Sequence, residues 1–195
     1  MRTATGTIFY RRNLPHYSQK DAIYFITFRL AGSLPKEVIL RLRENQCLPR
    51  IKHSRPSFVK FDNYLGSHLE SPQWLKDPRI ARLVADAIES GDKCLYTLFG
   101  YCIMANHVHL IIRPLDSDRP LCPILQLLKK NTALKANKVI GRSGQFWQHE
   151  SYDHIVRNAA ELERIMKYVW NNPVKVGLVS DASHWPWTSM RWELL

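Results

Sequence analysis

Two histidines lie two residues apart in the segment Asn106-His-Val-His-Leu-Ile-Ile112. Side chains two apart on a β-strand point to the same face, so His107 and His109 should project together while Val108 faces the core. Two imidazoles on a rigid strand make a good pair of ligands for a divalent metal ion. Taken alone, the pattern is also typical of two half-exposed histidines on a sheet surface, and a second group is needed to define a site.

A tyrosine and an asparagine share the end of the last predicted helix, which runs from Ala159 to about Asn171. At roughly 100° per residue, Tyr168 lies to one side of the apolar stripe of this helix, and Asn172 neighbours it four residues on. Pro173 disfavours helical geometry at Asn172 and should end the helix there. By itself this pair is also typical of a boundary tyrosine followed by a helix-terminal asparagine.

The histidine pair and the tyrosine–asparagine pair together have the groups needed for one reaction, the cleavage of a phosphodiester. Cutting a phosphodiester needs a nucleophile, a way to offset charge on the phosphoryl oxygens, and a leaving group that departs in line. Tyr168 can be the nucleophile, forming a phosphotyrosine and releasing a 3′-hydroxyl. We expect His107, His109 and the amide oxygen of Asn172 to hold Mg²⁺ or Mn²⁺, with positions left open for substrate and water. The covalent bond would conserve the phosphodiester energy, so that strands can be rejoined.

Several spaced motifs from about Tyr24 to Trp187 then resemble those of the REP-associated tyrosine transposases, which belong to the single-tyrosine branch of the HUH transposases. They are Met104-Ala-Asn-His-Val-His-Leu110, Phe146-Trp147, Ser151-Tyr-Asp-His154, Tyr168 and Asn171-Asn-Pro-Val-Lys-Val-Gly-Leu178. The resemblance implies an α+β, ferredoxin-like HUH endonuclease fold. It also implies cleavage of single-stranded DNA, often near a hairpin.

The resemblance carries over residue by residue. His107 and His109 match the metal-binding pair, Tyr168 matches the nucleophile, and Asn172 matches the polar third ligand, where other single-tyrosine transposases have glutamine. The family commonly has proline where Ala105 stands and alanine where Val176 stands. Neither departure changes a proposed ligand.

The elements that must position these groups can be outlined from periodicity and turn residues. We expect strands at Ile23–Leu30, Lys93–Met104 and His107–Arg113, and helices at about Lys36–Asn45, Pro78–Ser90, Leu121–Ile140 and Ala159–Asn171. This order predicts a single domain over residues 1–195, with one sheet covered by helices on one face. Residues 48–72 mix prolines, basic residues and aromatics, and are interpreted as an insertion.

The charge balance favours a polyanionic partner. Lys and Arg total 28 against 17 acidic residues, which gives a formal net charge of +11, and nucleic acid is the usual partner of such a chain. Candidate phosphate contacts are Lys129, Lys130, Lys135, Lys138, Arg142, Arg11 and Arg12, with a further basic cluster from Arg50 to Arg55. Trp147, Trp185 and Trp187 have the chemistry to stack on bases. The prolines flanking the last two favour anchors packed on the core.

The composition also indicates the cellular compartment of the protein. No apolar run approaches the length of a membrane span, and Met1–Tyr10 has no stretch of signal-peptide type. We therefore expect a cytoplasmic protein. The four cysteines, Cys47, Cys94, Cys102 and Cys122, show no paired zinc-binding spacing and are interpreted as buried free thiols. His149 and His154 are interpreted as structural or DNA-contacting rather than metal-binding.

Three alternatives stay open. The first is a binding module of the same fold that holds hairpin or single-stranded DNA without cutting it. A replication initiator or relaxase would use the same chemistry, although relaxases usually carry their tyrosine before the histidine pair. A zinc hydrolase built on His107 and His109 lacks a recognisable third His or Asp ligand and a nearby glutamate base. The sequence leaves undecided the DNA sequence recognised, monomer against dimer, and whether Tyr168 serves its own histidines or a partner's.

Overall fold

A computed structural model describes residues 8–11, 15–35, 37, 62–66, 71–116 and 121–195. The expected helix at Lys36–Asn45, most of the expected insertion at 48–72, Cys47, the Arg50–Arg55 cluster and Arg12 lie outside the described residues. So does the side chain of Arg11, although its backbone belongs to a short hairpin. That hairpin consists of β1 (Ile8–Arg11) and β2 (Pro15–Ser18), which pair antiparallel.

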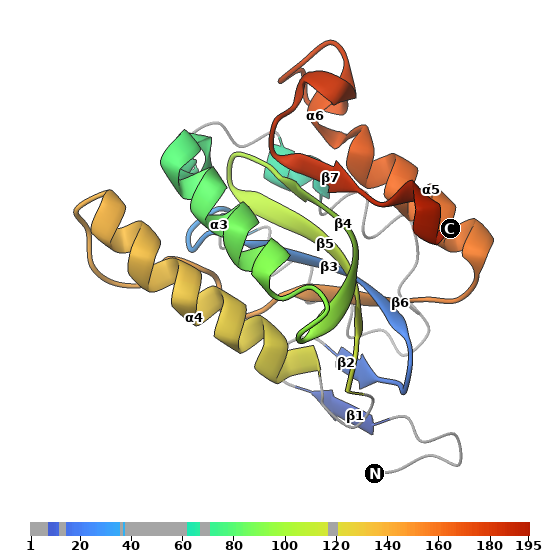
Figure 1. The fold of residues 1–195 in the computed structure, drawn as a ribbon. Helices are drawn as coiled ribbons and strands as arrows, with labels where there is room; N and C mark the ends of the chain where they lie inside the picture. The colour runs from blue at the N-terminus through green and yellow to red at the C-terminus, as the bar shows by residue number, and fades with distance from the viewer. Residues whose placement is uncertain (1–7, 12–14, 36, 38–61, 67–70, 117–120) are drawn as a thin grey trace.

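One antiparallel sheet organises the described chain (Figure 1). Its strand order is β6-β3-β5-β4-β7, where the strands are β3 (Ile23–Arg29), β4 (Tyr96–Ile103), β5 (His107–Pro114), β6 (Tyr152–Val156) and β7 (Thr188–Met190). Helix α3 (Pro78–Ser90) precedes β4, and α4 (Leu121–Val139) joins β5 to β6. The chain from β3 to β6 is therefore a ferredoxin-like β-α-β-β-α-β unit. β7 extends it at the β4 edge.

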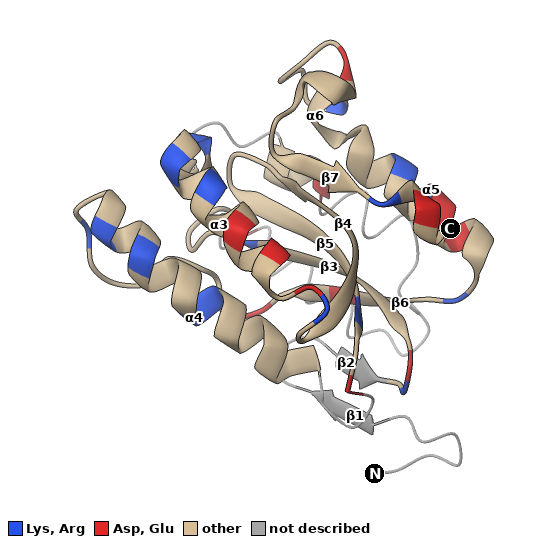
Figure 2. Cartoon of the chain, viewed as in Figure 1, with Lys and Arg blue, Asp and Glu red and all other residues tan. Residues whose placement is uncertain are grey.

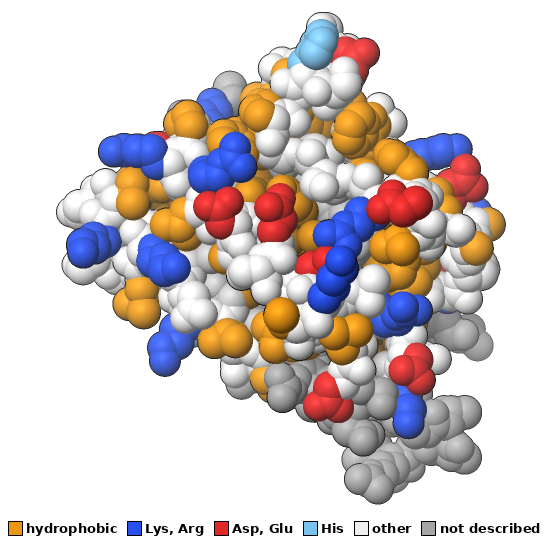
Figure 3. Space-filling view, in the orientation of Figure 1, with side chains coloured by type: hydrophobic (Ala, Val, Ile, Leu, Met, Phe, Trp, Pro, Cys, Tyr) orange, Lys and Arg blue, Asp and Glu red, His pale blue; other side chains and the backbone are white. Residues whose placement is uncertain are grey.

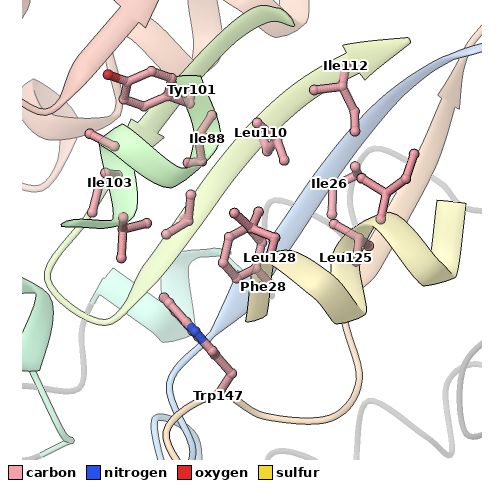
Figure 4. Close-up of a cluster of buried hydrophobic side chains, with 14 of the residues drawn as sticks. Ile26, Phe28, Ile88, Tyr101, Ile103, Leu110, Ile112, Leu125, Leu128 and Trp147 are labelled. Carbon is pink, nitrogen blue, oxygen red and sulfur yellow. The ribbon is translucent and has the colours of Figure 1, made fainter. Parts of the chain in front are cut away.

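Helices cover both faces of this sheet, so the expectation of one covered face was wrong. α3 and α4 lie on one face, and α5 (Ala159–Trp170) lies on the other (Figure 1). The pleat explains why both faces need cover. Val108, Leu110 and Ile112 enter the core beneath α3 and α4, as Figure 4 shows for Leu110 and Ile112, whereas Ile111 enters the core beneath α5.

The β4–β5 hairpin was predicted, but β6 and β7 were not. They are five and three residues long, and much of each strand is only partly buried, so neither has the regular apolar alternation that marks a strand in a sequence. β4 starts at Tyr96 rather than Lys93. Lys93 has a φ of 61°, a left-handed conformation that belongs to a turn and not to a strand.

The two ends of α5 each carry an asparagine, and the chain after the second end determines where Asn172 lies. Asn158 caps the start of α5 by accepting a hydrogen bond from the Glu161 backbone N–H. The helix ends at Trp170, close to the predicted boundary. The chain then starts a new four-residue helix, α6 (Asn172–Lys175), instead of simply stopping, and this turn buries Asn172 to 1% exposure.

Three short 3-10 helices are also present: η1 (Trp74–Lys76), η2 (Ala182–His184) and η3 (Trp192–Leu194). Across the described part of the chain, every helix is too short or too polar to span a bilayer. Cys102 is buried as expected, but Cys94 is exposed and Cys122 half-buried; all three are free thiols.

Candidate active site

His107 and His109 lie on the α5 side of β5 and both are buried, with at most 1% of either residue exposed. Their Nε2 atoms lie 3.2 Å apart. The two side chains therefore project together, as the sequence predicted. They are not the half-exposed surface histidines that the same pattern also allowed.

Asn106 fixes which nitrogen of His107 is free. Its Nδ2 donates to the Leu65 carbonyl (2.9 Å) and to Ser71 Oγ (3.0 Å), which turns its Oδ1 toward His107 Nδ1 at 2.7 Å. Because an amide oxygen only accepts hydrogen bonds, Nδ1 of His107 must donate. The Nε2 atom of a neutral His107 is then left with a lone pair that points into the site. Burial lowers the pKa of His107 and so favours this neutral form.

Thr27 orients the second imidazole. Its Oγ1 lies 2.8 Å from His109 Nδ1, and the two residues are register partners on β3 and β5. Each histidine thus has its Nδ1 held by a neighbouring polar group. Such outer contacts are typical of metal-binding histidines.

Asp62 joins the pair from a segment far away in the sequence. Its Oδ1 lies 3.2 Å from His109 Nε2 and 3.5 Å from His107 Nε2. Burial alone would raise the pKa of Asp62, but the neighbouring His109 and His107 outweigh it and hold that pKa well below the ordinary value. The carboxylate is therefore ionised and buried at 3% exposure.

Tyr168 brings a phenol to the same point. Its hydroxyl donates a hydrogen bond to Asp62 Oδ2, and its ring packs edge-on against the His109 ring, with centroids 6.2 Å apart. Burial raises the pKa of Tyr168, and the negative charge of Asp62 raises it further. The phenol is half-buried, so one side of it remains reachable.

Asn172 contacts the cluster through its amide nitrogen. Nδ2 lies 3.0 Å from Asp62 Oδ2 and 3.0 Å from His109 Nε2. The sequence led us to expect the amide oxygen here. The structure turns the nitrogen toward the cluster, where the Asp62 carboxylate oxygen can only accept a hydrogen bond.

The donor set fits a divalent metal ion. Asp62, His107 and His109 each offer one ligand atom, and all three atoms lie within 4.8 Å of one another. At this site two buried oxygens, Oδ1 of Asp62 and Oδ1 of Asn172, have no hydrogen-bond partner within the described part of the chain. Buried polar atoms are rarely left without one. One carboxylate and two imidazoles suit several divalent ions and do not by themselves select Mg²⁺ over Mn²⁺ or Zn²⁺.

Two further cations lie near these groups. Lys175 Nζ lies 3.4 Å from the Tyr168 hydroxyl and 3.7 Å from Asp62 Oδ2. Arg29 is two residues from Thr27 on β3, hence on the same face, and it pairs in register with His107. The Arg29 guanidinium donates to Ser33 Oγ (3.0 Å), and burial lowers its pKa to about 10.

Most of the predicted DNA-contacting lysines lie elsewhere. α4 packs on the face of the sheet opposite α5, and its basic residues lie on that layer (Figure 2). Lys130, Lys135 and Lys138 are exposed there. In the view of Figure 3, basic side chains are interspersed with apolar ones and do not form one continuous strip.

Lys129 and Arg142 have structural contacts. Lys129 Nζ donates to the backbone carbonyls of Gln148 (3.1 Å) and His149 (3.2 Å). The Arg142 guanidinium stacks 4.0 Å from the centre of the Trp74 ring and donates to the Gln145 carbonyl. Both side chains connect α4 and its end to the segment before β6.

The remaining aromatic candidates and His154 also pack against other parts of the protein. Trp147 is 4% exposed and donates to Thr132 Oγ1, while Trp185 donates to the Ile103 carbonyl. Trp187 is partly buried against the core. His154 pairs with Glu161 at 3.2 Å, whereas His149 is exposed.

Two residues of the cluster escaped sequence reasoning. Asp62 falls inside the stretch interpreted as an insertion, where no periodicity indicated which side chains turn inward. Lys175 lies inside the quoted motif at Asn171–Leu178 but had no spacing argument of its own. The carboxylate also removes one objection to a zinc hydrolase, since a third ligand of Asp type is present. The Tyr168 phenol, which is hydrogen-bonded to Asp62, distinguishes an enzyme with a tyrosine nucleophile from a zinc hydrolase.

Comparisons with known proteins agree with this geometry. A protein of Haemophilus influenzae described as a REP-associated tyrosine transposase is 29% identical over 97 residues, which cover 45% of this chain and 55% of the relative. The match thus spans about half the length of that relative. A solved structure of a REP-associated tyrosine transposase bound to a REP hairpin superposes with a TM-score of 0.50 at 18% identity, covering 92% of this chain and 80% of the other.

The structural likeness confirms the expected fold, and both relatives carry the family name that the sequence motifs indicated. The family model described as "Transposase IS200 like" matches residues 73–172, which include the histidine pair, Tyr168 and Asn172. The match extends over about half of the chain. This chain therefore belongs to the IS200-like transposase family.

Proposed function

We propose that this protein cuts and rejoins single-stranded DNA by a divalent-metal-dependent transesterification in which Tyr168 is the nucleophile. One observation carries the proposal: the Tyr168 hydroxyl donates to Asp62, and Asp62 contacts both His107 and His109. A nucleophile, a carboxylate and two imidazoles therefore meet at one point. A transposase family supports the same chemistry.

The site holds its own reacting groups in place. Asp62, His107 and His109 would hold the metal ion, with Asn172 beside them, and a bound Mg²⁺ or Mn²⁺ would offset negative charge on the scissile phosphate. The hydrogen bond to Asp62 and the edge contact with His109 fix the phenol of Tyr168. Pre-positioning of this kind supplies much of the rate in phosphoryl transfer.

The covalent step is a balanced exchange. Tyr168 Oη forms a bond to phosphorus, the bond from phosphorus to the 3′ oxygen breaks, and a 5′-phosphotyrosine remains. The phenol loses one proton and the departing 3′-hydroxyl gains one. In the reverse direction a 3′-hydroxyl displaces the tyrosine, so no outside energy source is needed for rejoining.

We propose single-stranded DNA next to a hairpin as the substrate. The solved relative is bound to a REP hairpin, which supports this choice. Arg29, buried on the histidine face, and the exposed Lys130, Lys135 and Lys138 would contact phosphates. The α4 lysines lie on the other face of the sheet, so they would hold the duplex stem or a distant part of the strand and not the scissile phosphate.

The test is a covalent-adduct assay. Labelled single strands that carry hairpins from both sides of the gene are incubated with the protein and Mg²⁺ or Mn²⁺, and the products are separated on a denaturing gel. We expect an adduct that is lost in Tyr168→Phe and with chelator but kept in Tyr64→Phe, which changes an exposed tyrosine in the segment of Asp62. Tight hairpin binding without any adduct would instead assign the protein to the non-cleaving binding modules.

A further inference from the structure

Lys175 contacts the Tyr168 phenol in two ways. Its Nζ lies 3.4 Å from the hydroxyl oxygen and 5.1 Å from the ring centre. The same Nζ lies 3.7 Å from Asp62 Oδ2, the oxygen to which the phenol donates. One ammonium group therefore touches the candidate nucleophile, its ring and its hydrogen-bond acceptor.

The break between α5 and α6 makes this contact possible. In one continuous helix a residue seven positions on would lie about 10 Å further along the axis, at 1.5 Å per residue. The chain instead leaves α5 at Trp170 and turns through α6, with Pro173 buried in the turn. Lys175 is carried back toward Tyr168 as a result, and 39% of its side chain remains exposed.

The Tyr168 hydroxyl is hydrogen-bonded to a negatively charged neighbour, the Asp62 carboxylate. A neutral phenol is a weak nucleophile and a poor leaving group, so a nearby cation has a clear use. Lys175 supplies that cation at hydrogen-bond reach of the oxygen.

We propose that Lys175 is a catalytic residue whose ammonium group stabilises the negative charge on the Tyr168 oxygen while DNA is cut and rejoined. This inference rests on the proposed function. In cleavage that charge accompanies formation of the bond from oxygen to phosphorus. In rejoining it returns as the same bond breaks and the tyrosine leaves. The ammonium group stays protonated throughout, and the phenol and the 3′-hydroxyl exchange their protons with water.

The first test separates chemistry from DNA binding. Single-turnover cleavage at saturating DNA is compared for the wild type, Lys175→Met and Lys175→Arg, with Lys167→Met as a charge-matched control whose exposed lysine pairs with Glu163. By analogy with loss of one stabilising donor at a half-exposed site, we expect Lys175→Met to slow cleavage and rejoining by about 10- to 100-fold. Lys175→Arg keeps the charge and should recover part of the rate.

Two results in this assay would overturn the inference. One is a weaker DNA affinity in Lys175→Met with an unchanged rate at saturation, which would make Lys175 a phosphate contact. The other is an Arg variant as slow as the Met variant although both bind DNA normally. Circular dichroism checks that each variant folds, and Lys175→Gln replaces Lys175→Met if that variant does not.

A second test needs neither DNA nor metal. An aryl sulfonyl fluoride reacts with phenolate oxygen, releasing fluoride, and mass spectrometry locates the modified tyrosine. With chelator present we expect faster labelling of Tyr168 in the wild type than in Lys175→Met, and no change in Lys167→Met. Equal labelling in all three proteins would contradict the inference. If labelling depends on Lys175 but the wild type forms no DNA adduct, the proposed function fails while the interaction between the two side chains stands.

Discussion

Tyr168 donates a hydrogen bond to Asp62, although 106 residues separate them in the chain. The contact completes the site on the α5 side of the sheet, because Asp62 also contacts the two histidines of β5. In this structure the phenol and the imidazoles of one chain lie together.

We expect removal of the Asp62 carboxylate to weaken metal binding. A direct measurement of affinity shows this loss better than an activity assay does. Loss of outer-shell partners of a metal site typically costs 10- to 100-fold in affinity, so loss of a ligand should cost at least about 10-fold. Titration calorimetry with Mn²⁺ on Asp62→Ala and the wild type measures this directly. Asp86→Ala, an exposed carboxylate on α3, is the control. Equal Mn²⁺ affinity in Asp62→Ala and the wild type would exclude Asp62 as a ligand.

Asn106 should matter for metal affinity without touching the metal. It holds the Nδ1 proton of His107 and is itself held by the Leu65 carbonyl and Ser71 Oγ. We expect Asn106→Ala to lower Mn²⁺ affinity by about 10- to 100-fold. It should also cost about 1–3 kcal/mol of unfolding free energy, because buried polar groups lose their partner.

A second variant sharpens the Asn106 prediction. Asn106→Asp keeps an oxygen for His107 but offers no N–H to the Leu65 carbonyl. It should therefore keep more Mn²⁺ affinity than Asn106→Ala while remaining destabilised. Calorimetry and urea unfolding on the same preparations separate the two effects, and the idea fails if both variants lose affinity equally.

A substitution of Leu110 tests whether the residues of β5 that stabilise the fold and those that bind metal lie on opposite faces of the strand. It follows His109 directly, yet it points into the core beneath α3 and α4 with no exposed surface (Figure 4). Leu110→Ala should destabilise the fold by about 2–5 kcal/mol, as large-to-small core changes do. Well below its melting temperature it should bind Mn²⁺ as tightly as the wild type. A large loss of affinity in the folded variant would show that the two faces are coupled.

The sequence predicted those parts of the fold and site that depend on local regularity. The spacing of His107 and His109 on a strand and of Tyr168 beside the stripe of α5 follow from fixed periods of two and 3.6 residues. Both placements are confirmed. Asn172 lies in the cluster because the chain turns into α6 at this residue. The sequence had predicted only that the helix ends there.

What the sequence missed depends on tertiary contacts. Asp62 has no periodic neighbours, and its role appears only when its segment lies over β5. β6 and β7 are strands because neighbouring edges pair with them, not because their residues alternate. A tertiary contact was also missed at Lys129: its position in a basic helix predicted a phosphate contact, and in the structure its side chain donates to two backbone carbonyls.

Lys129 gives a prediction about pH. Burial lowers the pKa of its ammonium group from 10.5 to about 8. Between these values the unfolded chain binds a proton that the folded chain does not, so the contribution of Lys129 to stability rises with pH across this window. Below pH 8 both states are protonated and that contribution is constant.

Urea unfolding at pH 7, 8, 9 and 10 checks this sign. The unfolding free energy of the wild type relative to Lys129→Met should increase from pH 8 to pH 10 and stay flat from pH 7 to pH 8. Lys130→Met removes one charge from the exposed neighbouring position and serves as the control. If the difference between wild type and Lys129→Met falls with rising pH, the ammonium group is stabilised by the Gln148 and His149 carbonyls more than burial disfavours it. The residue would then hold the segment before β6 as a charged group, and its pKa in the folded protein would lie above 10.5.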